Sequence, residues 1–195
     1  DLELSIKGRK AHGACPREGE NAIIMAFEAI TRIWGLNFMR TKHPILGWPQ
    51  VVPYWIKGGD PELYIVPDEA TIRFDVQLFP PFSPEEALRD IEMAIVDYGY
   101  LEVLDSDPPF EISPEAEVVK LAEEAFFLAL GQRATLTGMP SWTDAEPLHH
   151  KGIEVIVFGA GKLAEAHTEG ERVSLEELKL LAAVLDQLIS LASGG

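Results

Sequence analysis

Apolar and polar residues alternate along two segments of the first half of the chain, as expected of strands that bury one face. The alternation covers residues 2–7 and 70–78, and two further apolar stretches, 51–56 and 100–104, also predict strands. Residues 8–19 are rich in glycine, proline and charge and predict a loop. The pattern therefore predicts four strands within residues 1–104.

Apolar residues at helical spacing fill two of the gaps between these strands. One such stretch runs from Asn21 to Trp34 and is followed by Gly35, a residue that commonly ends helices. A second helix is predicted to begin at Ser83, because Ser83 can cap it and Glu86 stands three residues later. The resulting order is strand, helix, strand, strand, helix, strand.

This order predicts a ferredoxin-like α+β domain (βαββαβ) over residues 1–112. A proline-rich segment, 105–114, then predicts a linker or crossover. Residues 113–195 show a different pattern, with longer helical stretches and one short apolar run. The chain is therefore expected to contain two parts, 1–112 and 113–195.

The second part is predicted to hold two long helices and a buried strand. The first helix should open at Ser113-Pro114 and end at Gly131, and the last should open at the capping box Ser174–Glu177. The apolar run 153–158, bounded by glycines, suits a strand buried on both faces. These few elements would leave apolar faces exposed, so we expect them to complete a larger α/β domain.

Composition excludes several classes of function. With 32 acidic and 16 basic residues, the net charge of −16 argues against a nucleic-acid partner. No apolar run reaches the roughly 18 residues of a membrane span, and no membrane partner is expected. The single cysteine, Cys15, rules out an internal disulfide, and without a recognisable signal peptide we expect a cytoplasmic protein.

Three clusters could carry chemistry, although the chain has no P-loop, nucleophile elbow or His-Glu-x-x-His motif. His12 lies in a loop of small residues, where it can approach a ligand or simply face solvent. His167 follows the apolar run 153–158 and is a candidate metal ligand, with Glu171 as its partner, or part of a polar turn. Asp144 could act near a ligand or only cap a helix.

Several other histidines are expected to be structural or to face solvent. His149 and His150 are adjacent, so on a helix they point in different directions and cannot share a metal ion. His43 precedes a proline in an irregular stretch. Cys15 has no evident base partner and is a poor candidate nucleophile.

Taken in order, short motifs spread over the whole chain resemble one family. They include Gly8-x-x-Ala11-His12-x-x-x-Pro16, Gly19-x-Asn21-Ala22, Val66-Pro67, Asp75-Val76-x-x-x-Pro80, Thr143-Asp144-Ala145, Gly152 to Gly161, and Ala166-His167-Thr168-x-x-Glu171-x-Val173. Together they are similar to the zinc-dependent amidohydrolases and metallopeptidases that include acetylornithine deacetylase, succinyl-diaminopimelate desuccinylase, aminoacylase and related carboxypeptidases.

The resemblance implies an architecture and a metal cofactor. In that family a ferredoxin-like lid, which also makes a homodimer, is inserted into a catalytic domain that binds two metal ions, usually zinc. Residues 1–112 would be the lid, and 113–195 the C-terminal part of the α/β catalytic domain. The expected dimer contact is the edge strand of the lid with the helix of residues 20–34.

The resemblance also implies roles for individual residues. His167 matches a metal-ligand histidine, and His12 matches the lid histidine that reaches the partner subunit's active site and stabilises the oxyanion. Gly159 and Gly161 match a loop that lines the substrate pocket, and Asp144 an aspartate near it. The implied reaction is hydrolysis of the amide bond of an N-acyl amino acid or a small peptide.

The chain departs from the family pattern at several positions. The other metal ligands and the general-base glutamate lie upstream of the lid in that family, so this chain alone is predicted to be inactive. Tyr64 and Gln77 stand where the family often has an asparagine and an arginine that hold the substrate carboxylate, and Arg73 could compensate for Gln77. The alternatives are a catalytically inactive dimerisation or binding module, or a separate chain that supplies the metal half.

Overall fold

A computed structural model describes residues 1–194 of the chain. These residues form two compact units, of which the first is Asp1–Phe110 and the second begins at Glu111. The division falls inside the proline-rich segment that the sequence marks as a linker. Each unit has its own arrangement of helices and strands.

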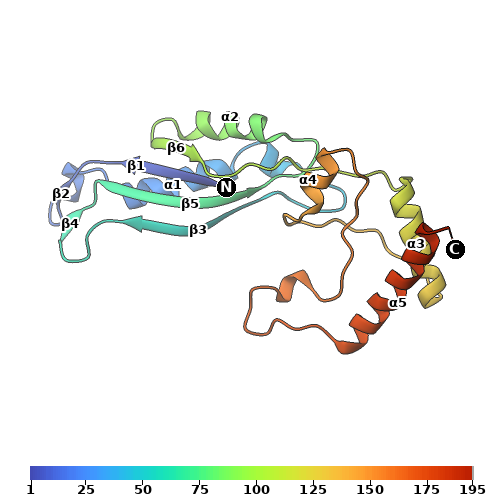
Figure 1. Cartoon of the computed structure of the whole chain (residues 1–195). Helices are drawn as coiled ribbons and strands as arrows, with labels where there is room; N and C mark the ends of the chain where they lie inside the picture. The colour runs from blue at the N-terminus through green and yellow to red at the C-terminus, as the bar shows by residue number, and fades with distance from the viewer. Residues whose placement is uncertain (195) are drawn as a thin grey trace. The chain divides into compact units, whose positions relative to one another are not determined.

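The first unit is built on a four-stranded antiparallel sheet with the order β3-β5-β1-β6. Its strands lie side by side in Figure 1 and are β1 (Leu2–Lys7), β3 (Gln50–Gly58), β5 (Glu69–Gln77) and β6 (Gly99–Val103). In the register of the sheet, Leu4 of the central strand β1 lies opposite Ile72 on one side and Leu101 on the other. Each predicted strand of this unit is therefore confirmed.

Two helices pack on one face of the sheet, α1 (Ala22–Trp34) and α2 (Pro84–Ile95). The Asn21 side chain caps α1 by accepting hydrogen bonds from the backbone amides of Ile23 and Ile24. At α2, Ser83 and Glu86 form the reciprocal capping box that the sequence predicts. Sheet order and helix positions confirm the ferredoxin-like fold.

The core of this unit lies between the sheet and the two helices. Alternate residues of the central strands point into it, and Leu4 and Phe74 are fully buried there. Ile33 from α1 and Ile91 from α2 fill the same core. The opposite face of the sheet carries polar and charged residues such as Arg73, so the sheet buries one face only.

A second, very small sheet joins β2 (Ala11–His12) to β4 (Ile65–Val66). Short 3₁₀ turns follow at Pro16–Glu18 and Phe38–Arg40. The sequence pattern did not predict β2 or β4, because a two-residue strand has no periodicity of its own. This small sheet fixes the position of the loop that carries His12.

The second unit consists of helices and loops. Helices α3 (Glu117–Leu130) and α5 (Leu175–Ala192) pack against each other, and α4 (Ala145–His150) and the 3₁₀ turn η3 (Leu163–Glu165) lie between them in sequence (Figure 1). Within residues 111–194 few apolar side chains are buried, namely Val119, Ala125, Ala145 and Val184. No helix in residues 1–194 is both long and apolar enough to cross a membrane.

Two expectations for this unit are wrong. Helix α3 begins at Glu117 and not at Ser113, because Ser113 instead makes a turn in which its hydroxyl and carbonyl oxygens accept the amides of Glu115 and Ala116. Residues 153–158 form no strand, and Ile153 and Phe158 remain 49% and 44% exposed. A strand needs a neighbouring strand for its backbone groups, and residues 111–194 provide none.

Candidate functional site

The candidate residues fall in both units. His12 and Arg73 lie in the first, and Asp144, Gly159, Gly161 and His167 lie in the second. Local contacts within each unit determine how these residues are held.

His12 is an exposed side chain on a well-supported piece of backbone. It pairs with Ile65 in the small β2-β4 sheet, and the amide of Gly13 donates to the carbonyl oxygen of Tyr64 at 3.0 Å. The amide of Cys15 donates back to the His12 carbonyl oxygen at 2.8 Å, closing a turn over residues 12–15. The side chain of His12 is therefore exposed to solvent, while hydrogen bonds hold the backbone that carries it.

The ring of His12 is also held. Its Nδ1 atom accepts a hydrogen bond from the backbone amide of Ala14 at 3.1 Å. This bond fixes the orientation of the imidazole and leaves Nε2 as the outward-facing ring nitrogen. Sequence patterns did not predict this contact, because no side-chain motif distinguishes Ala14 from any other loop residue.

Two glycines make room for this loop. A Cβ atom at Gly8 would lie 2.0 Å from the carbonyl oxygen of Glu20, and one at Gly13 would lie 2.6 Å from the ring of Tyr64. Both glycines are thus required for close packing of the segments that support His12. The glycine-rich spacing of the His12 motif has a physical cause in these contacts.

Arg73 lies on the open face of the sheet. Its Nε atom is 2.6 Å from a carboxylate oxygen of Glu3 on the neighbouring strand, and its guanidinium lies over the ring of Trp55. The hydrogen bond to Glu3 raises the pKa of Arg73 above its ordinary value. Gln77 lies on the same face of β5, four residues further along. Arg73 is thus already paired, with its charge partly neutralised by Glu3.

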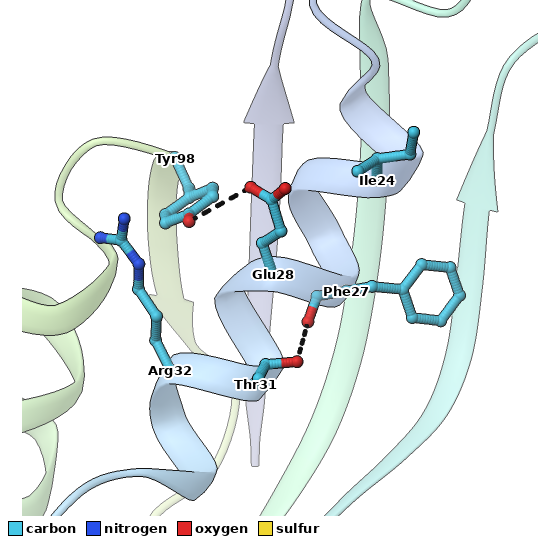
Figure 2. A pocket seen from close by; sticks show the side chains of 6 residues that line it. All are labelled: Ile24, Phe27, Glu28, Thr31, Arg32 and Tyr98. Atoms are coloured by element: carbon cyan, nitrogen blue, oxygen red, sulfur yellow. Dashed lines mark hydrogen bonds between the residues drawn. The ribbon is translucent and has the colours of Figure 1, made fainter.

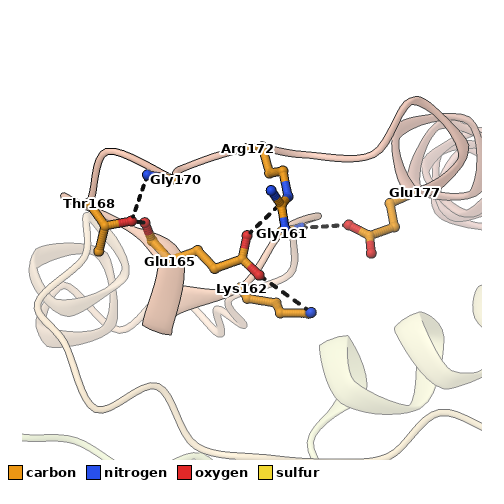
Figure 3. A network of polar contacts seen from close by, with 7 residues as sticks. All are labelled: Gly161, Lys162, Glu165, Thr168, Gly170, Arg172 and Glu177. Carbon is orange, nitrogen blue, oxygen red and sulfur yellow. Dashed lines mark hydrogen bonds and ion pairs between the residues drawn. The ribbon is translucent and has the colours of Figure 1, made fainter.

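In the second unit, a polar network orders the loop that contains Gly161 and His167 (Figure 3). Glu165 forms ion pairs with Lys162 at 3.4 Å and with Arg172 at 3.8 Å. The amide of Gly161 donates to the carboxylate of Glu177 at 3.2 Å. These contacts fold residues 161–172 back on themselves and anchor them to the first turn of α5.

The bond from Gly161 corrects one detail predicted for the last helix. Ser174 caps α5 as expected, by accepting the amides of Glu176 and Glu177. The Glu177 carboxylate, however, binds Gly161 and does not complete a capping box. The sequence contains no sign of this pairing, because sixteen residues separate its two partners.

His167 is exposed and has an unusual backbone. Its φ angle is +60°, which is uncommon for a residue other than glycine. Its amide donates to the carboxylate of Glu171 at 2.9 Å. Glu171 is therefore a partner of His167, as the spacing indicated, but the contact is made to the backbone.

The other two candidates have simpler surroundings. Gly159 lies in open space, since a Cβ atom added there would meet no atom of residues 1–194 within 4 Å. Asp144 stands at the N-cap position of α4 without capping it; Thr143 instead accepts the amide of Ala145 through its hydroxyl oxygen. On the same helix His150 lies 3.2 Å from Glu146, while the ring of His149 packs edge-on against that of His150.

No three metal-binding side chains meet within residues 1–194. His167 offers one exposed imidazole, whereas a stable metal site needs three or four protein ligands. The residues present therefore do not by themselves fit a zinc ion or a pair of them.

Helix α1 carries an exposed apolar strip on the side away from the core. Ile24 and Phe27 are 55% and 61% exposed, and with Thr31 and Arg32 they line a shallow hollow (Figure 2). Glu28 and Tyr98 line the same hollow, and the hydroxyl of Tyr98 donates to Glu28 at 3.4 Å. The neighbouring strand β3 is an edge of the sheet and also exposes large apolar side chains.

These features define a ferredoxin-like domain. It exposes a histidine on a loop that backbone hydrogen bonds hold in place, and it exposes an apolar face of α1 next to the edge strand β3. Residues 1–99 match the peptidase dimerisation domain of the M20 peptidases, and the chain belongs to this family. The resemblance found in the motifs is thereby confirmed.

Similar proteins cover the second unit as well. The chain is 26% identical to an uncharacterized metallohydrolase of Methanocaldococcus jannaschii, over 96% of this chain and 50% of that protein. It is 26% identical to an acetylornithine deacetylase of Myxococcus xanthus, over 99% of this chain and 52% of that protein. A tripeptidase structure from Staphylococcus aureus aligns with 25% identity and a TM-score of 0.74, over 100% of this chain and 51% of its own. The chain thus spans about half the length of these relatives.

Proposed function

We propose that this chain is the dimerisation lid and the C-terminal part of the catalytic domain of a metal-dependent hydrolase. The substrate would be an N-acyl amino acid or a small peptide, cleaved at its amide bond. The observation that carries the proposal is His12, which projects from a rigid loop of a domain that belongs to the M20 dimerisation family. Hydrolase names among the relatives support the reaction class.

His12 would act as a preorganised hydrogen-bond donor. During amide hydrolysis the carbonyl oxygen gains negative charge, and a donor already aimed at that oxygen stabilises the transition state without further reorganisation. His12 suits this role because backbone contacts hold its loop and its ring before any substrate binds. It would serve the active site of the other subunit.

Metal binding is assigned mainly to residues outside this chain. Two zinc ions would supply the activated water, and His167 would be one of their ligands. Because residues 1–194 bring no three candidate ligands together, we expect this chain alone to show no turnover. Gly159 and Gly161 would line the substrate pocket, with Asp144 nearby and Arg73 as a candidate contact for the substrate carboxylate.

The protein would be a homodimer joined through α1 and the edge strand β3. Large apolar side chains on both elements face solvent, and monomeric proteins rarely leave such surfaces open beside an unpaired strand. Ile24 and Phe27 on α1 would pack against the same residues of the partner.

Zinc content and hydrolysis of an N-acetyl amino acid, measured together, test the proposal. They should be compared between this chain and the longer protein that contains it. Two zinc ions and turnover in the longer protein, with neither in this chain, is the expected result. Bound metal and turnover in this chain alone would mean that the assignment of its residues is wrong.

The alternative is a metal-free dimerisation or binding module that retains the lid fold. The lack of a three-ligand cluster in residues 1–194 is the observation that favours it. A longer protein that dimerises but binds no zinc and hydrolyses no acyl amino acid or peptide would support this alternative.

A further inference from the structure

The ring of His12 has a hydrogen-bonding arrangement that determines which of its nitrogens carries the proton. A backbone amide is always a donor, so the nitrogen that it contacts must supply a lone pair. The Ala14 amide contacts Nδ1 at 3.1 Å. In the neutral ring the proton must then reside on Nε2, which faces away from the backbone.

We infer that the Ala14 amide is a positioning group that locks neutral His12 in the Nε2–H tautomer, making it a hydrogen-bond donor and preventing it from acting as a base. The inference rests on the proposed function only where it assigns that donor to a developing oxyanion. Its structural content, a single tautomer set by one backbone amide, stands on the contact itself.

The other tautomer is disfavoured by the same geometry. A proton on Nδ1 would face the Ala14 amide hydrogen, and the amide would lose its partner. Losing one such hydrogen bond corresponds to a roughly tenfold change in the ratio of the two tautomers. The amide cannot easily turn away, because the neighbouring amides of Gly13 and Cys15 are bonded to Tyr64 and His12.

The tautomer of His12 determines which chemical groups its ring can bind. A ring with Nε2–H outward can donate to an acceptor such as a carbonyl oxygen, a carboxylate or an oxyanion. It has no lone pair on that nitrogen with which to take a proton from water or to bind a metal ion. His12 therefore differs in role from His167, which is the candidate metal ligand.

A second histidine, His43, also accepts backbone amides at Nδ1 and provides a reference within the same chain. The Nδ1 atom of His43 accepts the amides of Ile45 and Leu46 at 3.2 and 3.1 Å, and this residue is 9% exposed. His43 should therefore show the same tautomer for the same reason. The NMR resonances of the His12 ring can therefore be compared with those of the His43 ring.

The test is a long-range proton–nitrogen NMR spectrum of the histidine-labelled chain at about pH 8, where an ordinary imidazole is neutral. His12→Asn identifies the His12 signals by removing them. We expect separate Nδ1 and Nε2 resonances of the unprotonated and protonated types, as at His43. Resonances averaged between the two types, as in an unstructured peptide, would overturn the inference.

A backbone substitution tests the role of Ala14 itself. Lactic acid in place of Ala14 puts an ester oxygen where the amide N–H was and keeps the methyl group. The His12 resonances should then move toward the averaged values, while those of His43 stay unchanged. Unchanged His12 resonances would show that the amide does not set the tautomer.

Hydrogen exchange at the Ala14 amide gives a second measurement that does not depend on the ester. His12→Ala should speed exchange roughly tenfold, whereas His12→Asn should not, because the Asn side-chain oxygen occupies the place of Nδ1. Equal exchange in both variants would contradict the inference. None of these readouts needs turnover, so a failure of the proposed function would appear separately, as full activity of a longer protein carrying His12→Ala.

Discussion

The Glu171 carboxylate accepts a hydrogen bond from the backbone amide of His167 at 2.9 Å, and His167 has a φ angle of +60°. A positive φ is disfavoured for a side chain with a Cβ atom, so the loop must supply compensating contacts. The hydrogen bond to Glu171 is one of them, since it ties the amide across the turn. Glu171 therefore stabilises the backbone conformation of His167, the candidate metal ligand.

Glu171→Ala should therefore weaken metal binding in the longer protein. We expect a roughly tenfold loss of zinc affinity, because removing a group that orients a metal ligand typically costs that much or more. Competition with a chelator measures it. Glu171→Gln keeps an acceptor oxygen and is the matched control, which should stay close to the wild type. Equal zinc affinity in all three proteins would show that Glu171 does not orient the candidate metal ligand.

The pairing of Arg73 with Glu3 leads to a second prediction. Glu3→Gln removes the carboxylate that now neutralises Arg73, and the pKa of Arg73 should fall toward its ordinary value. If Arg73 contacts the substrate carboxylate, KM for an N-acetyl amino acid should fall by roughly two- to fivefold, the range expected for an exposed charge pair.

The control for that prediction is the amide derivative of the same substrate, which lacks the carboxylate. Its KM should not change in the Glu3→Gln protein. A KM that is unchanged for both substrates would show that Arg73 only packs on Trp55 and stabilises the open face of the sheet.

Much of the first unit could be predicted because its signals are local. Asn21 and Ser83 cap helices through residues two and three positions away, and such contacts can be read from sequence alone. The strands around Leu4 and Phe74 alternate clearly because one face is buried. The short motifs taken together, of which the one containing His12 is the first, also identified the family correctly.

The remaining features depend on contacts between distant residues. Strand β2 exists only because Ala11 lies opposite Val66. The Glu177 carboxylate accepts the amide of Gly161 and does not make the capping bond expected of it. Residues 153–158 have the composition of a buried strand but form none, because composition cannot supply the neighbouring strand that hydrogen bonding requires.

His43 provides a test of stability in the first unit. Its ring accepts two backbone amides and contacts Phe79, so His43→Ala leaves two partly buried backbone donors without a partner. We expect a loss of about 1–3 kcal/mol in the free energy of unfolding. Urea unfolding followed by tryptophan fluorescence measures it, since Trp48 lies close by in sequence.

The matched variant is His43→Asn, whose side-chain oxygen can take over the role of Nδ1. It should recover most of the lost stability. If Asn destabilises as much as Ala, packing of the ring against Phe79 accounts for the effect, and the two hydrogen bonds do not.

Dimerisation through α1 predicts that Phe27→Glu yields a monomer. The substitution places a charge in the centre of the exposed apolar strip, and a second charge would face it from the partner across a two-fold axis. Sedimentation velocity measures the change. Met93→Glu on α2 is the control, because Met93 is similarly exposed but lies on the other helix. Monomeric wild-type protein at high concentration would refute the proposed interface.

A final prediction tests whether His12 serves the partner's active site. In the longer protein, His12→Ala should lower kcat by about 10²- to 10³-fold, the usual effect of losing one oxyanion donor. His167→Ala should also be inactive, because it lacks a metal ligand. When the two inactive variants are mixed under conditions that allow subunit exchange, half of the dimers should contain one chain of each kind.

Each mixed dimer would then hold one intact site, made from His167 of one chain and His12 of the other. Activity should return to roughly a quarter of the wild-type value, because half of the dimers are mixed and each has one working site of two. If His12 acted within its own subunit, no mixed dimer would contain an intact site and activity would stay at the level of the separate variants. Steady-state assays before and after exchange distinguish the two arrangements.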